Sequence, residues 1–215
     1  GVNTDKVIVS ELKYLQNMDS WMNNATLPLI KEYMKARLVS GNAGNLDQRL
    51  DDINFNFYSK YLQGQKEQRS MDKRGLGVIN GTLGEAFGKL YVEKYFPAEA
   101  KAQMETYISY LKKGFEYHIA NLDWMSAETK VKAQEKLSKF SVKIASPDTW
   151  KDYSKLQLTA PVEGGTYYTN LQKVSEWQYA KNLDKVGKPV DKTEWGMAPQ
   201  TVNAYYSGSN NEIVF

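Results

Sequence analysis

The sequence lacks cysteine entirely and has a single histidine, His118, among its 215 residues. Without cysteine, this chain can form no disulfide, thiolate metal site or cysteine nucleophile, although the compartment stays open. A catalytic zinc normally takes three protein ligands, so a site built here would combine one imidazole with carboxylates. His118 lies between Phe115 and Leu122 on an apolar stripe, which predicts a core or core-edge histidine. The residue pattern contains no complete catalytic set, but acid-base catalysis by carboxylates alone stays open, since Asp51, Asp52 and Glu93 are available.

Long hydrophobic runs and charge of one sign are also missing. No apolar stretch approaches the roughly 18 residues of a membrane-spanning helix, and no signal-peptide pattern opens the chain. Lysine and arginine number 28 against 25 aspartates and glutamates, giving a net charge of +3. The densest basic stretch, Lys66–Arg74, includes two acidic residues. Phosphate binding needs a sustained surface of one sign, so nucleic acid is not an expected partner.

Most of the chain has the apolar spacing of amphipathic helices. From Thr4 to about Ala145, apolar residues recur three and four positions apart. Ser126 is predicted to cap a helix that runs to about Phe140 or Ala145, because serine at this position accepts a backbone hydrogen bond of the first turn. The pattern indicates a helical domain.

Four glycines are spaced along one predicted helix. Gly77, Gly81, Gly84 and Gly88 follow each other at intervals of four, three and four, which places them on one face. A nucleotide-binding loop would need a preceding strand and a different glycine spacing. We favour a structural interpretation, in which the bare face lets another backbone approach closely.

The pattern changes after residue 146. Ser146-Pro147-Asp148 ends the helix, and aromatic and β-branched residues become frequent. Val202–Tyr206 and Glu212–Phe215 flank a turn-rich cluster and predict a β-hairpin, which needs further strands or a packed partner to be stable. We predict a mainly α chain with a helical domain at 1–146. Residues 147–215 would be a linker and a mixed α+β part that ends in the hairpin.

The predicted strand Thr201–Tyr206 includes an amide side chain at Asn203 and a small residue at Ala204. At a sheet edge, such a strand pairs its backbone with an extended peptide, and Asn203 can hold one peptide unit. An internal strand that is paired on both sides explains the same residues equally well. The residue pattern leaves both alternatives open.

Four stretches of the sequence resemble, in the right order, signature segments of the neprilysin family of zinc metalloendopeptidases, which includes neprilysin, endothelin-converting enzyme and bacterial oligopeptidase O. The resemblance is good from about residue 80 to 215 and weak before it. Ala145-Ser146 departs from the Gly-Tyr that the family usually has there. The stretches are GKLYVEKYFP (88–97), LDWMSAETKVKAQEKL (122–137), SPDTWKDYS (146–154) and GKPVDKTEWGMAPQTVNAYYSGSNNEIVF (187–215).

The resemblance implies a function and a place in a longer protein. Family members hydrolyse oligopeptides with a zinc held by a His-Glu-x-x-His helix and a later glutamate, and this chain would be a fragment that ends just before that helix. It would supply the helical domain of the substrate chamber and bind no zinc itself. The missing C-terminal catalytic part would be its partner. By resemblance, the Asn203 amide and the Ala204 carbonyl bind the substrate backbone, and the whole protein is exported, as a periplasmic, extracellular or membrane-anchored enzyme.

Two other hypotheses remain at this stage. The chain could belong to a non-catalytic peptide-binding or scaffold relative that has lost the metal site. It could also be an all-helical interaction protein with a chance hairpin, although four ordered motifs argue against this. The first alternative differs from the peptidase hypothesis in the sequence expected after Phe215.

Overall fold

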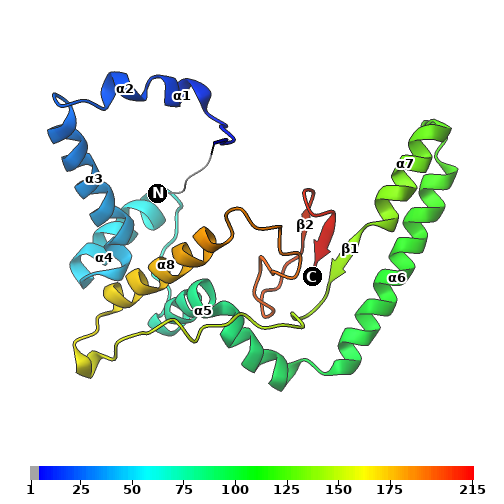
Figure 1. The fold of residues 1–215 in the computed structure, drawn as a ribbon. Helices are drawn as coiled ribbons and strands as arrows, with labels where there is room; N and C mark the ends of the chain where they lie inside the picture. Colours follow the sequence, from blue (N-terminus) through cyan, green and yellow to red (C-terminus); the bar gives the residue numbers. More distant parts are fainter. Residues whose placement is uncertain (1–4) are drawn as a thin grey trace. The chain divides into compact units, whose positions relative to one another are not determined.

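A computed structural model describes residues 5–215 (Figure 1). The chain divides into two compact units, each built from two stretches of sequence. The first unit comprises residues 1–71 and 156–188, and the second comprises residues 72–155 and 189–215. Helices dominate both units, which confirms the predicted mainly α class. Among the described residues, no helix combines the length and the apolar character needed to cross a bilayer.

The first unit consists of helices joined by short turns. Asp47 begins α4 by accepting a hydrogen bond from the Leu50 amide at 3.0 Å. The helical apolar spacing predicted for this part of the chain continues from α4 into a π-helix at Phe55–Tyr61, where wider winding replaces the 3.6-residue period. The helical segments are α1 (Leu12–Gln16), α2 (Met18–Trp21), α3 (Leu27–Asn42), η1 (Ala43–Asn45), α4 (Gln48–Asn54), η2 (Phe55–Tyr61), η3 (Pro161–Glu163) and α8 (Tyr167–Asp184).

The second unit combines three long helices with a small sheet. Its elements are α5 (Met71–Tyr95, which starts at the unit boundary), α6 (Ala98–Asn121), α7 (Ala127–Ser138), β1 (Ser141–Lys143), β2 (Tyr205–Ser207) and β3 (Glu212–Val214). Ser126 caps α7 as predicted, because its hydroxyl accepts a hydrogen bond from the Thr129 amide at 3.2 Å. α7 then packs against α6, which it follows in the chain (Figure 1).

The end of α7 differs from the prediction. The helix stops at Ser138 instead of running to Phe140 or Ala145, and Ser141–Lys143 forms β1. β1 pairs in parallel with β3, with Val142 opposite Ile213. Ala145 has a positive φ of 67°, a backbone conformation that no helix contains. Pairing with a distant strand therefore overrides the local helical spacing. Sequence periodicity alone does not reveal such a pairing.

The predicted hairpin is present and has a third strand. β2 and β3 are antiparallel with Tyr206 opposite Ile213, and the sheet order is β1-β3-β2. β1 thus supplies the extra strand that a hairpin needs, and Val214 in the central strand is completely buried. β2 begins at Tyr205 rather than at residue 201 or 202. In this register Ala204 lies opposite Phe215.

The glycine face on α5 is used in part. A Cβ atom added at Gly84 would lie 3.1 Å from the Ala198 Cβ, and one added at Gly88 would lie 2.7 Å from the Pro199 Cδ. The predicted close approach is therefore real at these two glycines. At Gly77 and Gly81 the same test finds nothing within 4 Å among the described residues. The glycine face therefore contacts one short segment, Ala198–Gln200, which we call the docking segment, rather than a whole neighbouring helix.

Candidate substrate-binding segment

Asn203 and Ala204 lie directly before β2, and both are exposed. The Asn203 amide N–H donates to the Thr201 carbonyl at 2.9 Å, and the Asn203 Oδ1 accepts from the Ala204 N–H at 2.8 Å. Among the residues that the structure describes, the side-chain NH₂ of Asn203 has no hydrogen-bond acceptor. The structure therefore leaves a donor of Asn203 available at the surface.

The chain that leads to Asn203 is fixed at three points within the second unit. The Lys143 ammonium donates to the Glu194 carbonyl at 2.7 Å. The Gly196 N–H donates to the Tyr205 hydroxyl at 3.1 Å, so the start of β2 holds an earlier part of the same segment. The third point is Gln200, whose side chain donates to α5. An otherwise irregular segment is thereby held in one conformation.

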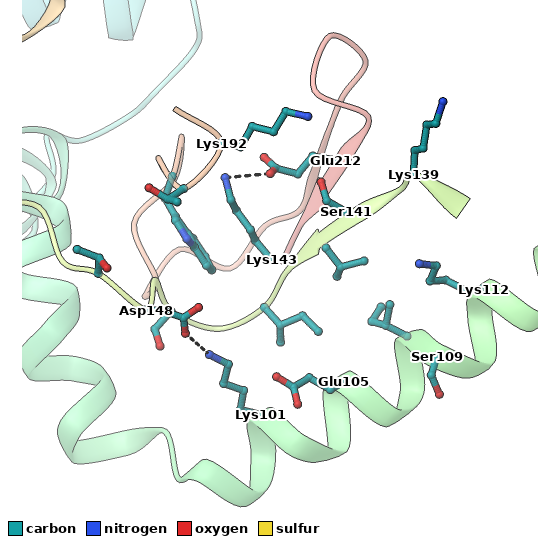
Figure 2. Close-up of a pocket in the computed structure, with 17 residues that line it drawn as sticks. Lys101, Glu105, Ser109, Lys112, Lys139, Ser141, Lys143, Asp148, Lys192 and Glu212 are labelled. Atoms are coloured by element: carbon teal, nitrogen blue, oxygen red, sulfur yellow. Dashed lines mark hydrogen bonds and ion pairs between the residues drawn. The ribbon is translucent and has the colours of Figure 1, made fainter. Parts of the chain in front are cut away.

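A cavity of about 560 Å³ lies beside this segment (Figure 2). The Lys143 and Glu212 side chains point toward each other there, with Nζ and Oε2 2.9 Å apart and only 12% and 4% of the side chains exposed. Lys101 and Asp148 form a second pair at 3.2 Å. The lining residues are Lys101, Glu105, Ile108, Ser109, Lys112, Lys139, Ser141, Val142, Lys143, Ile144, Ser146, Asp148, Thr149, Lys192, Thr193, Trp195 and Glu212.

The ion pairs of the cavity link elements that are distant in sequence. Lys143 lies on β1, Glu212 on β3, and Glu194 on the segment that leads to Asn203. The Lys143 and Glu212 charges neutralise each other, and the Glu194 backbone carbonyl accepts from the same ammonium, so these contacts stabilise the arrangement. The sequence does not reveal this cluster, since the paired residues are 47 positions or more apart and follow no motif.

Glu85 on α5 holds the stretch after Asp148. Its carboxylate accepts a hydrogen bond from the Lys151 backbone N–H, and the Lys151 ammonium lies 4.0 Å from it. Burial of the Tyr153 hydroxyl, and next the negative charge of Glu85, raises the pKa of this phenol above its ordinary value. These contacts are structural and lie outside the Asn203 segment.

The described residues do not fit a zinc site. In residues 5–215, no three histidine, aspartate or glutamate side chains lie close enough together to hold a metal ion. The prediction of a core or core-edge position for His118 is wrong, because this residue is exposed on α6 with its ring 5.7 Å from that of Tyr117. The apolar spacing is present, but neighbouring Phe115 is also 58% exposed, so this part of the stripe is not covered within the chain.

The sequence and fold of this chain are similar to those of known peptidases. The family model that describes peptidase family M13 matches residues 1–147. The chain is 32% identical over 212 residues to the neutral endopeptidase of Lactococcus lactis subsp. lactis (strain IL1403), covering 98% of this chain and 33% of that protein. Over 217 residues it is 31% identical to neprilysin-11 of Caenorhabditis elegans, covering 99% of this chain and 26% of that protein.

Solved structures agree with this assignment. The crystal structure of Mycobacterium tuberculosis zinc metalloprotease Zmp1 in complex with an inhibitor has a TM-score of 0.83 and 35% identity, covering 95% of this chain and 29% of that one. PepO from Lactobacillus rhamnosis HN001 has a TM-score of 0.85 and 26% identity, covering 94% and 32% of the two chains. The chain belongs to peptidase family M13. It spans about a third of the length of the Lactococcus relative.

Proposed function

We propose that this chain is part of a zinc-dependent endopeptidase that hydrolyses oligopeptides. Residues 1–146 would contribute the helical domain of the substrate chamber, and residues 147–215 would begin the catalytic domain. The zinc ligands and the catalytic residues would lie outside this chain. The whole protein would be exported, a proposal supported by relatives such as membrane metallo-endopeptidase-like 1 of Homo sapiens, which is 30% identical over 220 residues.

The observation that carries this proposal is the exposed amide of Asn203 next to an unpaired edge strand. In the described sheet, β2 pairs with β3 on one side only. An extended peptide bound here would accept a hydrogen bond from the Asn203 NH₂ and donate one to the Ala204 carbonyl. The three anchors of the segment support this role, because a pre-positioned donor loses less conformational entropy when the peptide binds.

Substitution of Asn203 in the whole protein tests this function. Asn203→Ala removes the donor, and Asn203→Asp keeps the shape but replaces the NH₂ with a carboxylate oxygen. We expect KM for an oligopeptide to rise about 2- to 10-fold in Asn203→Ala, which is the loss of one hydrogen bond. Asn203→Asp should be at least as defective, because the carboxylate repels the peptide carbonyl.

The control for this test is Asn121→Ala. Asn121 is an exposed asparagine at the end of α6, where its amide donates to the Tyr117 carbonyl at 2.8 Å. The KM of the Asn121→Ala variant should match that of the unsubstituted protein. An unchanged KM in both Asn203 variants would rule out substrate binding by this residue. Retained peptide binding without any hydrolysis by the whole protein would instead favour the non-catalytic peptide-binding relative.

A further inference from the structure

Gln200 attaches the segment that leads to Asn203, residues 194–203, to α5. Its Nε2 donates to the Asn80 Oδ1 at 2.8 Å and to the Gly84 carbonyl at 2.9 Å, so both amide hydrogens are used. These partners are 120 and 116 residues away in the sequence. They lie on either side of Leu83, where α5 bends with a non-helical φ of −116° and ψ of 25°.

The Gln200 side chain fills a space that only glycine leaves open. A Cβ atom at Gly88 would lie 2.5 Å from the Gln200 Oε1 and 2.7 Å from the Pro199 Cδ. Gly84 and Gly88 are both buried in the structure. The Gln200 Oε1 is also buried, and it accepts no hydrogen bond from the described residues. A buried acceptor without a donor costs free energy, which offsets part of what the two hydrogen bonds donated by Nε2 contribute.

A series of local hydrogen bonds connects this anchor to Asn203. The Thr201 N–H donates to the Ala198 carbonyl at 3.0 Å, and the Asn203 N–H donates to the Thr201 carbonyl at 2.9 Å. Val202, between them, is fully exposed, so packing of its side chain does not fix this stretch. The position of Asn203 therefore depends on the anchor before it and on β2 after it.

We propose that Gln200 is a positioning residue for substrate binding: by fixing residues 198–200 on the Gly84 and Gly88 face, it sets the orientation of the Asn203 amide. This inference rests on the proposed function of Asn203. Gln200 itself touches no substrate, because its amide is turned toward α5. Its effect on catalysis passes through Asn203 alone.

A double-mutant cycle in the whole protein tests the inference. Gln200→Met keeps the length of the side chain and removes both donors. We expect KM for an oligopeptide to rise about 2- to 10-fold with a smaller change in kcat, as expected when one substrate hydrogen bond is misplaced. In the Asn203→Ala background, Gln200→Met should raise KM no further, since the group that it positions is already absent.

Asn80 provides a milder variant that does not disturb packing. Asn80 is exposed on α5, so Asn80→Leu removes one acceptor of Gln200 with little risk to folding. Asn80→Asp retains an acceptor oxygen. KM should rise in Asn80→Leu, less than in Gln200→Met, and stay near the unsubstituted value in Asn80→Asp.

The outcomes separate the two proposals. If Asn203→Ala raises KM but Gln200→Met and Asn80→Leu do not, or if the Gln200 and Asn203 effects multiply, the positioning role is wrong and the proposed function stands. If Asn203→Ala and Asn203→Asp both leave KM unchanged, the proposed substrate binding by Asn203 is wrong and the positioning role falls with it.

Discussion

The contact between α5 and the Ala198–Gln200 segment predicts opposite effects for two glycine-to-alanine substitutions on the same helix. At Gly77, an added Cβ meets nothing within 4 Å among the described residues. At Gly88, it meets the Pro199 ring at 2.7 Å and the Gln200 Oε1 at 2.5 Å. The Gln200 side chain can rotate away, but the proline ring moves only if the backbone moves.

The magnitudes follow from two opposing terms. Alanine inside a helix is more stable than glycine by about 0.5–1 kcal/mol, and this gain applies at both positions. Overpacking of a filled site costs about 1–3 kcal/mol, and this cost applies only at Gly88. Gly77→Ala should therefore stabilise the chain by about 0.5–1 kcal/mol, while the net effect of Gly88→Ala should be a destabilisation of up to about 2.5 kcal/mol.

Hydrogen exchange of the α5 amides in the full chain measures this difference, because exchange reports the opening free energy of one region rather than of the whole chain. The α5 amides should be better protected in Gly77→Ala and less protected in Gly88→Ala than in the unsubstituted chain. Equal stabilisation by the two substitutions would show that Pro199 and Gln200 do not lie against Gly88, and the account of the docking segment would be refuted.

Three other predictions concern the second unit. Glu212→Gln removes the charged partner of the largely buried Lys143 ammonium, which keeps only its hydrogen bond to the Glu194 carbonyl, and should lower the free energy of unfolding by up to about 3–5 kcal/mol. Lys143→Met with Glu212→Leu should recover most of this loss in urea unfolding. The pKa of Tyr153 is raised in the folded state, so the contribution of this phenol to the free energy of unfolding is complete below a pH of about 10 and is lost as pH rises through the higher folded-state pKa. In an absorbance titration, the phenol that ionises late should be missing in Tyr153→Phe. Asn211 has a φ of +51° and donates to the Lys136 carbonyl at 2.8 Å, so thermal unfolding should show Asn211→Ala to be less stable than Asn211→Gly by about 1 kcal/mol.

The sequence correctly predicted those features of the fold that depend on interactions between residues close together in the chain. The Ser126 cap depends on a side chain and an amide three residues later, and the hairpin turn depends on its own residues. The glycine spacing on α5 correctly indicated a close approach, although not its partner. The resemblance to the neprilysin family rested on ordered motifs, and the family comparison confirmed it.

Features that depend on distant partners could not be predicted. β1 forms because Val142 and its neighbours pair with a strand about 70 residues later, against the helical spacing of the region. The exposure of His118 was missed because apolar spacing identifies a stripe but not what covers it. Gln200 follows no motif, and only the structure shows that it reaches α5. The roles of Asn203 and Ala204 stay predictions until they are tested.

The most direct test of the central claim compares the zinc content and peptidase activity of residues 1–215 with those of the whole protein. Zinc is measured by mass spectrometry after exhaustive dialysis, and hydrolysis of an oligopeptide is followed with and without a chelator. The account predicts stoichiometric zinc and chelator-sensitive hydrolysis in the whole protein, and neither in residues 1–215. Stoichiometric zinc in residues 1–215, or chelator-sensitive hydrolysis that follows this chain through purification, would contradict it.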